Sequence, residues 1–270
     1  MRTARTLPRL SYGSGALAVE GSRTLPEEVA VAISYNGTTQ AVMMATPADL
    51  VDFAYGFSLT EGIAAPADID SVEVVETPRG VDLQIWLRPQ AEARLARRRR
   101  QMAGPVGCGL CGIDSLDEAL RPPARIPELS FTMSPAQVRA AIATLPGAQP
   151  LHDTTHAAHA AGFWSGQLLA TREDVGRHNA LDKLAGHLAR TPHPTGAVLL
   201  TSRVSIDMVQ KVAALGQPIL IAVSAPTAHA IDLAHQAGLT LIALARRDRF
   251  EVFTHPGRIT APTSEASHVA

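Results

Sequence analysis

The spacing of apolar residues is clearest in the last third of this chain. Residues 197–200, 219–223 and 239–245 are unbroken apolar runs, and the segments between them have helical spacing. Strands this apolar are buried on both faces, which is typical of a parallel sheet covered by helices. Crossovers between such strands are right-handed. The pattern predicts an α/β domain with a largely parallel sheet core, which we place at residues 126–270.

The first half of the chain has shorter strands and more polar helices. Asn36-Gly37 stands between two apolar runs within residues 29–45, and this dipeptide is a strong hairpin signal. Residues 72–75 and 81–87 have the composition of two further strands. These strands, with the helices between them, predict a smaller α+β domain at residues 26–125.

Capping signals place three helices in the chain. Thr46 and Pro47 suit the N-cap and first position of a helix that runs towards Gly62. A basic helix is predicted at residues 90–102, and Ser134 caps a third helix. Residues 1–25 are polar and glycine-rich, so we predict a loosely ordered N-terminal segment.

Composition narrows the function classes. The 270 residues carry a net charge of −1 and 46% hydrophobic residues. That balance gives no field that would attract nucleic acid. The chain has no apolar run of the roughly 18 residues that a membrane span needs. Two cysteines do not make a disulfide framework, so we expect a protein of the reducing cytoplasm with no membrane partner.

Both cysteines lie in one short glycine-rich stretch, at Cys108 and Cys111. Four arginines, Arg97 to Arg100, precede it, and residues 97–113 contain no carboxylate. A thiol in a mobile, electropositive loop ionises more readily than a free one, and the thiolate is the reactive form. The pattern indicates cysteine chemistry on a flexible arm.

Other interpretations of the Cys-x-x-Cys remain open. A zinc site would need ligands beyond these two cysteines, and no histidine lies near them in sequence. A redox pair of the thioredoxin type would open a helix after a strand, and flanking glycines fit that poorly. Buried structural thiols would have apolar neighbours. The residues favour sulfur or thiol transfer over metal binding or a structural role.

A second polar block runs from residue 171 to residue 183. Gly176 lets the backbone approach a ligand, and Asp174 can cap a helix. The alternative is a solvated helix start with local ion pairs. The mixture of charges, amide and imidazole favours a binding site. The candidate binding residues are Arg172, Asp174, Arg177, His178, Asn179 and Lys183.

Further candidates follow the apolar strands, where open α/β sheets bind their ligands. Helix N-termini at these strand ends suit a phosphate-bearing anion. The residues there are Thr201, Ser202, Arg203, Ser224, Thr227, Arg246 and Arg247. A hydroxyl, an imidazole and a guanidinium on a turn suit a phosphate or a purine edge, although such turns are common on surfaces. They occur in the stretch Phe253, Thr254, His255, Pro256, Gly257, Arg258.

Three histidines, His152, His156 and His159, occur within eight residues. Their helical spacing suggests a metal site, but zinc would require a third ligand in place. We favour a polar turn that leads into a strand.

Taken together, these motifs resemble the FdhD family of formate dehydrogenase accessory sulfurtransferases. The resemblance covers about residues 30–260, and the block from Arg172 to Lys183 is its most specific part. It is carried by Cys108-Gly-Leu-Cys111, the Arg172–Lys183 block, Ser202-Arg203 with Met208-Val-Gln-Lys211, Ser224-Ala-Pro-Thr227 and Thr254-His-Pro-Gly-Arg258.

The resemblance implies a sulfur carrier. Such proteins take sulfane sulfur from a cysteine desulfurase as a persulfide and deliver it to the molybdenum cofactor, a bis(molybdopterin guanine dinucleotide), for formate dehydrogenase. Cys108 would carry the persulfide, and the stretch from Phe253 to Arg258 would bind the cofactor, which is a client and not a permanent group. The family fold has a cytidine-deaminase-like C-terminal domain and a homodimeric assembly.

Three points stay open. The family carries Thr-Gly-Gly-x-His where this chain has Thr155-His156-Ala157-Ala158-His159, so we assign no binding role to this stretch. Cys111 would relay sulfur, resolve the persulfide or tune its neighbour. The alternative functions are a non-catalytic chaperone for the cofactor and a zinc-dependent deaminase, although the His-x-Glu and Pro-Cys-x-x-Cys signature of the latter is absent.

Overall fold

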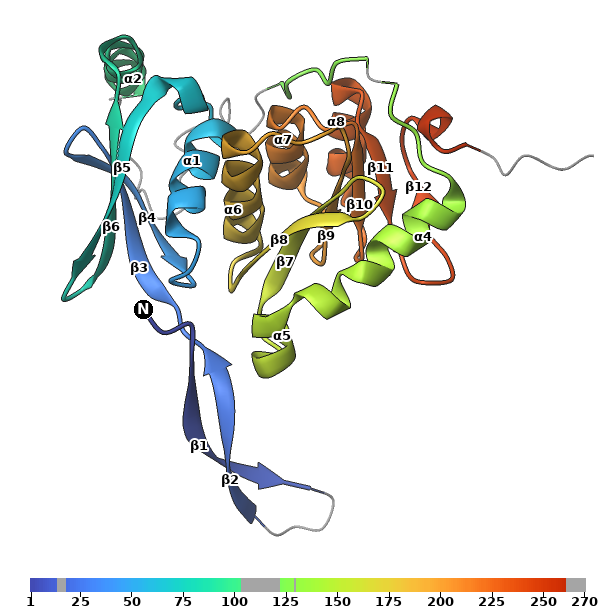
Figure 1. Cartoon of the computed structure of the whole chain (residues 1–270), viewed down its shortest axis with the longest axis horizontal. Helices are drawn as coiled ribbons and strands as arrows, with labels where there is room; N and C mark the ends of the chain where they lie inside the picture. Colours follow the sequence, from blue (N-terminus) through green and yellow to red (C-terminus); the bar gives the residue numbers. More distant parts are fainter. Residues whose placement is uncertain (14–17, 103–121, 129, 261–270) are drawn as a thin grey trace, which may run out of the picture.

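The computed structural model describes residues 1–13, 18–102, 122–128 and 130–260 (Figure 1). Its strands form a two-stranded sheet, a four-stranded sheet of order β4-β3-β6-β5 and a six-stranded sheet of order β12-β11-β10-β9-β7-β8. The strands are β1 (Ala4–Tyr12), β2 (Ala18–Pro26), β3 (Val29–Tyr35), β4 (Thr38–Ala45), β5 (Ile69–Thr77), β6 (Gly80–Leu87), β7 (His159–Trp164), β8 (Leu168–Asp174), β9 (Ala197–Leu200), β10 (Ile219–Ala222), β11 (Thr240–Ala243) and β12 (Glu251–Val252). The α-helices are α1 (Leu50–Thr60), α2 (Pro89–Met102), α4 (Pro135–Thr144), α5 (Pro150–Thr155), α6 (Arg177–Arg190), α7 (Ile206–Ala214) and α8 (Ala228–Ala237).

The four-stranded sheet is covered on one face by α1. Val31, Ile33 and Leu83 of the sheet share a buried cluster with Phe53 and Phe57 of the helix. The inward residues alternate with outward ones, as expected for a sheet with one buried face. The predicted hairpin is confirmed, because β3 and β4 meet at an Asn-Gly turn in which both residues have positive φ.

The centre of the six-stranded sheet confirms the strongest sequence prediction. Strands β9, β10 and β11 are parallel, and every residue in them is buried. The sheet as a whole is mixed, which corrects the expectation of a largely parallel sheet. Strand β7 is antiparallel to β8 and β9, and β12 is antiparallel to β11. Strand β8 is the return of a hairpin, so it needs no crossover helix.

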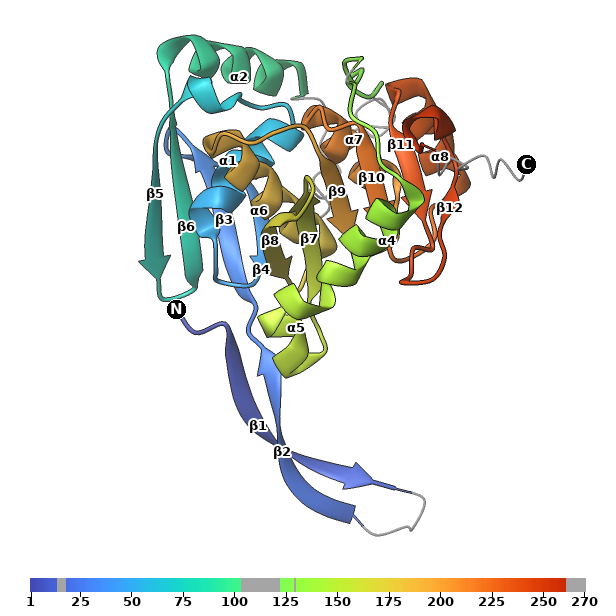
Figure 2. The ribbon, with the colours of Figure 1, turned by 45° about the vertical axis from the view of Figure 1, so that its right-hand side comes forward.

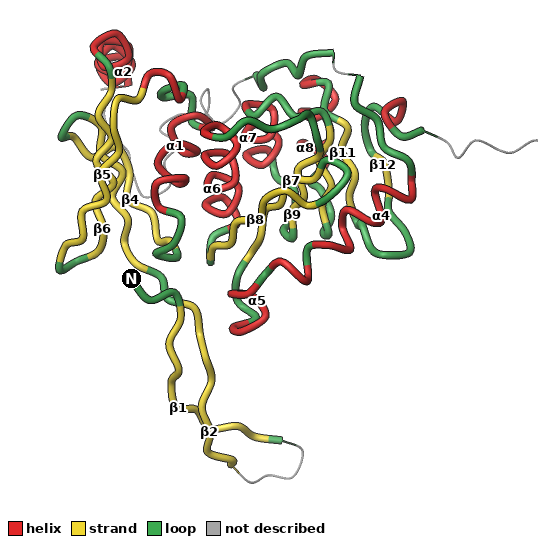
Figure 3. The backbone as a smooth tube through the Cα atoms, viewed as in Figure 1, coloured by secondary structure: helices red, strands yellow, loops and turns green. Residues whose placement is uncertain are grey.

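Helices cover both faces of this sheet (Figure 3). One buried cluster joins the sheet to α6, α7 and α8, and a second joins its other face to α4. The predicted cap of α4 is confirmed, since Ser134 Oγ accepts from Gln137 N at 3.2 Å and Ser134 N donates to Gln137 Oε1 at 2.8 Å. The result is a stack in which α1 and α6 lie between the two larger sheets (Figure 2).

Helices α1 and α6 pack backbone against backbone. A Cβ added at Gly56 would lie 1.6 Å from the carbonyl oxygen of Asp182, and one added at Gly186 would lie 1.8 Å from that of Asp52. Only glycine permits this approach at the two positions. The contact joins α1, which covers the four-stranded sheet, to α6, which covers the six-stranded sheet. We call it the α1–α6 seam.

Gly56→Ala is expected to destabilise the protein by about 3 kcal/mol, because the added methyl group meets backbone and the helices must move apart. The measurement is urea unfolding followed by circular dichroism. Gly147→Ala is the matched control, since a Cβ there meets no atom within 4 Å. Equal midpoints for the two variants would show that the seam is not closely packed.

Two local features concern the N-terminal ribbon and the start of α1. Among the described residues, β1 and β2 pair as an antiparallel ribbon from Ala4↔Pro26 to Tyr12↔Ala18, and the expectation of a loosely ordered N-terminal segment stays a prediction. The ribbon projects away from the rest of the molecule (Figure 1). Thr46 does not cap α1, which begins at Leu50 after Asp49 in a left-handed conformation, φ 52°. The polar atoms of Thr46 are instead used at the seam.

The predicted domain boundary near residue 125 stays a prediction. Each of the two larger sheets has its own buried clusters. The boundary lies beside residues 103–121, which are outside the described residues.

Candidate functional site

The predicted catalytic cysteines, Cys108 and Cys111, lie outside the described residues. The chain is described up to Met102, the end of α2, and again from residue 122. After that point it is anchored by Ile126, which is buried and whose N–H donates to the carbonyl oxygen of Ala237 at 2.9 Å. The described chain therefore resumes beside the end of α8.

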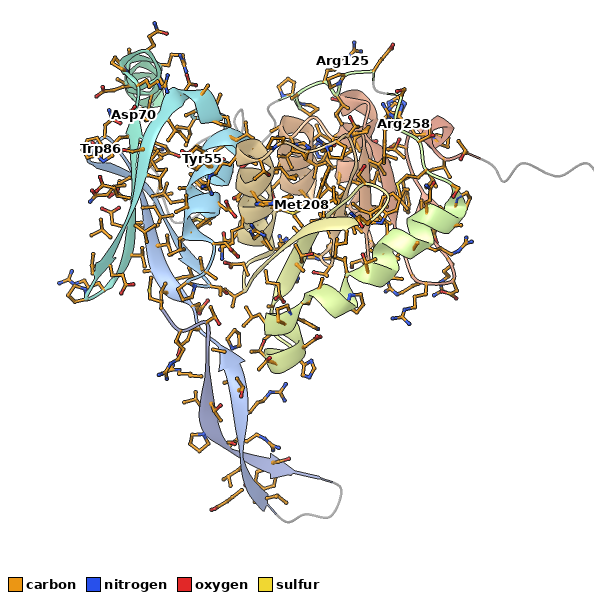
Figure 4. The ribbon with its side chains drawn as sticks, in the orientation of Figure 1. Tyr55, Asp70, Trp86, Arg125, Met208 and Arg258 are labelled. Atoms are coloured by element: carbon orange, nitrogen blue, oxygen red, sulfur yellow. The ribbon has the colours of Figure 1, made fainter. Side chains whose placement is uncertain are left out.

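The segment after this anchor runs beside the predicted cofactor-binding stretch. Met133 N donates to Arg258 O at 3.0 Å, and Thr260 N donates to Met133 O at 3.0 Å. Arg125 and Arg258 lie at the same end of the molecule in Figure 4. The structure thus places the chain that follows the two cysteines next to the Phe253–Arg258 stretch.

Thr254 fastens this stretch to β11. Its side chain is buried, its Oγ1 donates to Leu239 O at 2.6 Å, and it accepts from Leu241 N at 2.9 Å. Phe253 packs against the main core cluster and donates its N–H to Leu241 O at 2.8 Å. The hydroxyl predicted to bind a ligand is therefore occupied by the protein backbone.

His255 and Arg258 complete the turn. His255 has φ 45°, its ring stacks on that of His235 at 5.0 Å, and its carbonyl oxygen accepts from Thr240 Oγ1 at 2.9 Å. Arg258 Nη1 donates to Gly238 O at 2.8 Å, and burial lowers the pKa of this guanidinium. These contacts hold the turn against β11 and α8, and its tip at residues 256 and 257 is exposed.

The polar block centred on residue 174 holds the seam together. Lys183 and Asp174 are both fully buried, and Nζ lies 2.6 Å from Oδ2. Lys183 Nζ also donates to Thr46 O at 2.8 Å, while Thr46 N donates to Asp174 Oδ2 at 3.0 Å. Val175 N donates to Thr46 Oγ1 at 3.1 Å. The polar atoms of Thr46 are thus hydrogen-bonded to residues more than a hundred positions away in the sequence.

Asn179 belongs to the same network. Its Nδ2 donates to Met44 O at 2.8 Å and to Asp174 Oδ1 at 3.1 Å. The second acceptor also receives Gly176 N at 2.8 Å. The amide therefore joins β4 to the start of α6, and it is buried.

Arg172 is bound at the other end of the seam. Its Nε and Nη2 donate to Asp52 Oδ2 at 2.9 and 2.8 Å, and Arg190 Nη1 donates to Asp52 Oδ1 at 2.6 Å. Arg172 Nη2 also donates to His187 Nδ1 at 2.9 Å. A guanidinium can only donate, so His187 Nδ1 accepts this hydrogen bond, and burial and the nearby Arg172 lower the pKa of the imidazole.

Sequence reasoning missed a third buried group at the seam. Lys211 Nζ lies 2.9 Å from Asp182 Oδ1, 2.6 Å from Glu61 Oε1 and 3.0 Å from Thr60 Oγ1. Burial opposes the charge on Lys211, but the two carboxylates outweigh it and raise its pKa. The available signal was a lysine on the otherwise apolar face of a helix.

The predicted binding residues therefore lie in separate places in the structure. Four of its members are engaged at the seam, namely Arg172, Asp174, Asn179 and Lys183. A ligand would have to compete with buried ion pairs and hydrogen bonds to reach them. Their role in binding stays a prediction, and the structure shows them joining the two larger sheets.

Other members lie at the carboxyl end of the parallel strands. Arg203 is exposed, and Ser202 is buried with its Oγ donating to Arg203 O at 3.0 Å. Ser224 is half-buried, and Thr227 Oγ1 caps α8 by accepting from Ala230 N at 3.2 Å. Arg177 and His178 open α6 at the same end. These residues thus lie at one end of the sheet, and their role in binding stays a prediction.

The Phe253–Arg258 stretch lies at the opposite end of the sheet. Its contacts are to Leu239, Thr240 and Gly238, which begin β11 or precede it, whereas Ser224 follows β10. The structure therefore does not bring the two predicted phosphate-binding sets together. A ligand that contacts both would have to extend across the sheet.

Within the ranges described above, no group of three or more His, Cys, Asp and Glu residues could hold a metal ion. His152 and His156 have rings 5.7 Å apart, but His152 Nδ1 is bonded to Ala158 O at 3.0 Å. Among the same residues, no helix is long and apolar enough to cross a membrane.

Fold and site together define a mixed α/β protein in which two larger sheets are joined by buried ion pairs and polar residues lie at both ends of the six-stranded sheet. The FdhD/NarQ family model matches residues 26–260, and the chain belongs to this family. It is 52% identical over 263 residues to the sulfur carrier protein FdhD of Agrobacterium fabrum, covering 94% of this chain and 96% of that protein. It is 56% identical over 245 residues to the protein of the same name from Brucella abortus, covering 89% and 91%.

A solved structure shares the fold. The crystal structure of a candidate formate dehydrogenase accessory protein from Desulfotalea psychrophila aligns with a TM-score of 0.74 and 26% identity. The alignment covers 96% of this chain and 100% of that one. The mixed α/β architecture is therefore a known one.

Proposed function

We propose that this chain is a sulfur carrier that serves formate dehydrogenase, and that Cys108 is the residue that carries the sulfur atom. The observation that supports this most is its identity of 52% and 56% to proteins named sulfur carrier protein FdhD, together with its Cys108-Gly-Leu-Cys111 motif. No other cysteine occurs in the sequence, so sulfur chemistry on a thiol has only these two positions.

The sulfur is loaded by an exchange between a thiol and a persulfide. The Cys108 thiolate attacks the terminal sulfur of a persulfide on a cysteine desulfurase, the sulfur–sulfur bond there breaks, and the desulfurase thiolate leaves. Cys108 then holds the persulfide. A thiol of low pKa is both loaded and unloaded readily, and the arginines at 97–100 favour its ionised form. In unloading, the persulfide sulfur–sulfur bond breaks, the terminal sulfur passes to a reduced client that supplies the two electrons needed to make it a sulfido ligand, and Cys108 leaves as the thiolate.

We propose the molybdenum cofactor, a bis(molybdopterin guanine dinucleotide), as the client. Its guanine would contact the exposed tip of the Phe253–Arg258 turn, where a Cβ at Gly257 would meet no atom within 4 Å and the backbone is open to approach. The carboxyl end of the sheet offers Arg177, His178 and Arg203 to phosphates. The chain that follows the cysteine stretch runs beside the turn at Met133, which supports a client bound there.

The cytidine-deaminase-like description of the C-terminal half is part of the proposal. Three parallel strands with helices on both faces and an antiparallel hairpin at one side support it. We propose the fold as a cofactor-binding scaffold without deaminase chemistry. A tightly bound zinc ion in the purified protein would instead favour a deaminase-like enzyme.

Mass spectrometry tests the proposal. Purified protein is incubated with cysteine and a cysteine desulfurase, digested without reductant and compared with Cys108→Ala and Cys111→Ala variants. We expect a gain of one sulfur atom on the peptide that contains residues 104–112, lost in the first variant and retained in the second. An unmodified peptide in the wild type would reject sulfur transfer and leave a non-catalytic chaperone for the cofactor.

We also propose that the protein is a cytoplasmic homodimer and that the β1–β2 ribbon contributes to its interface. Leu10, Tyr12 and Val19 of the ribbon are 57, 72 and 63% exposed. An isolated two-stranded ribbon is marginal in water, so a partner surface would stabilise it. Two cysteines in a long chain suit the reducing cytoplasm.

Leu10→Ser with Tyr12→Ser is expected to shift the protein from dimer to monomer, because the variant removes exposed apolar area and keeps the ribbon. Sedimentation equilibrium at micromolar concentration measures the change. Val42→Ser is the control, because this residue is 61% exposed on β4, outside the ribbon. A dimer that persists in the double variant would place the interface elsewhere.

A further inference from the structure

Basic side chains gather at the carboxyl end of the six-stranded sheet, around His159. This residue opens β7 and is the register partner of Asp174, the last residue of β8. Arg177 and His178 follow as the first two residues of α6, and His152 reaches the group from α5. We call His152, His159, Arg177 and His178 the His159 cluster.

The members of this cluster act on one another. His159 is half-buried, and its burial lowers the pKa of its imidazole. His152 Nδ1 is hydrogen-bonded to the carbonyl oxygen of Ala158, the residue before His159, at 3.0 Å. Arg177 comes three residues after Asp174, the register partner of His159. Residues from α5, β7 and α6 therefore bring basic side chains together, and the charges of Arg177, His152 and His178 lower the pKa of His159 as well.

Two carboxylates face the cluster, and both are engaged. Asp174 raises the pKa of His159, but its oxygens accept from Lys183 Nζ and from two N–H groups. Asp207 Oδ2 lies 3.4 Å from His178 Nε2, and this imidazole lowers the pKa of Asp207. No carboxylate in the described part of the chain forms an ion pair with Arg177.

Arg177 carries the clearest sign of a missing acceptor. Its Nε is buried and has no hydrogen-bond partner among the described residues. Buried donors are nearly always paired, and an unpaired guanidinium N–H costs more than a neutral one. The first N–H groups of α6 also lack a side-chain acceptor. The helix begins with Arg177 and His178, has no acidic residue in its first turn and has no side-chain cap.

We propose that the His159 cluster binds a phosphate oxyanion, at a site separate from the Phe253–Arg258 turn. A phosphate or pyrophosphate group offers enough oxygens to accept from Arg177 Nε, from the imidazoles and from the first N–H groups of α6. Under the proposed function this group belongs to the client cofactor, and the inference depends on that function only for the identity of the natural ligand. The bound oxyanion also favours a proton on His159.

Pyrophosphate alone tests the site. The full-length protein is titrated with pyrophosphate by calorimetry, and the imidazole signals are followed by NMR between pH 5 and 8. We expect saturable binding and a raised pKa of His159 in the complex. Arg177→Gln should weaken binding by about 10-fold or more, which is the loss of one charge-assisted hydrogen bond. Arg177→Lys should lie between the two, because it keeps the charge without the Nε donor.

Arg79→Gln is the matched control, because it removes an exposed guanidinium in the turn between β5 and β6, outside both proposed binding sites. Unchanged pyrophosphate affinity in this variant, with loss in Arg177→Gln, supports the inference. Absence of binding, equal binding in Arg177→Gln, or a His159 pKa that pyrophosphate does not move would each overturn it. Persulfide loading of Cys108 is not part of this measurement, so failure of the phosphate site is distinguishable from failure of sulfur transfer.

Discussion

Cys108→Ala is expected to lower formate dehydrogenase activity by more than about 100-fold in cells that depend on this protein, because the substitution removes the nucleophile itself. A binding defect would leave a fraction of activity that rises with expression. Loss of the nucleophile leaves none. The assay is formate oxidation in extracts of cells whose own carrier gene is deleted and replaced by the variant.

Cys111→Ala separates the two thiols in the same assay. We expect it to retain more activity than Cys108→Ala, since the first cysteine accepts the sulfur. Immunoblots against the carrier normalise for its abundance. Full activity in Cys108→Ala would remove sulfur transfer from the account and favour a chaperone that only holds the cofactor.

Lys183→Met is expected to destabilise the protein by about 3–5 kcal/mol, because it leaves the carboxylate of Asp174 buried without its cation. The pair is fully buried, and the lysine also holds Thr46 O across the seam. Urea unfolding at neutral pH measures the change. A loss of this size would identify Lys183 as a residue that joins the two larger sheets.

The double variant Lys183→Met with Asp174→Asn provides the control. Removing both charges should recover part of the lost stability, because no unpaired ion remains in the interior. An additive loss would argue against a coupled pair. Unchanged stability in Lys183→Met, with a defect only in cofactor binding, would return this lysine to the ligand site that the sequence predicted.

The sequence predicted those elements that are determined by residues close together in the chain. Strands β9 to β11 follow from their uniform apolar composition, since both faces are buried. The hairpin follows from the Asn36-Gly37 turn, and the start of α4 follows from Ser134 and its capping partner. In each case, residues within a few positions of one another fix the structure.

Long-range pairing explains what the sequence did not predict. Thr46 has the sequence of a helix cap, but its N–H, hydroxyl and carbonyl are used by Asp174, Val175 and Lys183. Lys211 is paired with Glu61, the C-cap of α1, and with Asp182 of α6, and no local pattern connects these residues to it. Periodicity reports which face is buried and carries no information on the partner of a buried charge.

The candidate site shows the same limit. The sequence located polar residues at strand ends, and Arg203 and Thr227 do lie at the carboxyl end of the sheet. It did not show that the Phe253–Arg258 turn lies at the other end, because β12 is a short antiparallel return. The position of the turn follows from this reversal of chain direction. A strand of two residues is too short to be predicted from the sequence.

Transfer of labelled sulfur tests the central claim most directly. The carrier is loaded with radioactive sulfur from cysteine and a desulfurase, freed of both, and mixed with formate dehydrogenase whose cofactor lacks its sulfur ligand. The account predicts that the label leaves Cys108 and appears in the enzyme's cofactor as activity rises. Label that stays on the carrier, or activity that rises equally with the Cys108→Ala protein, would contradict it.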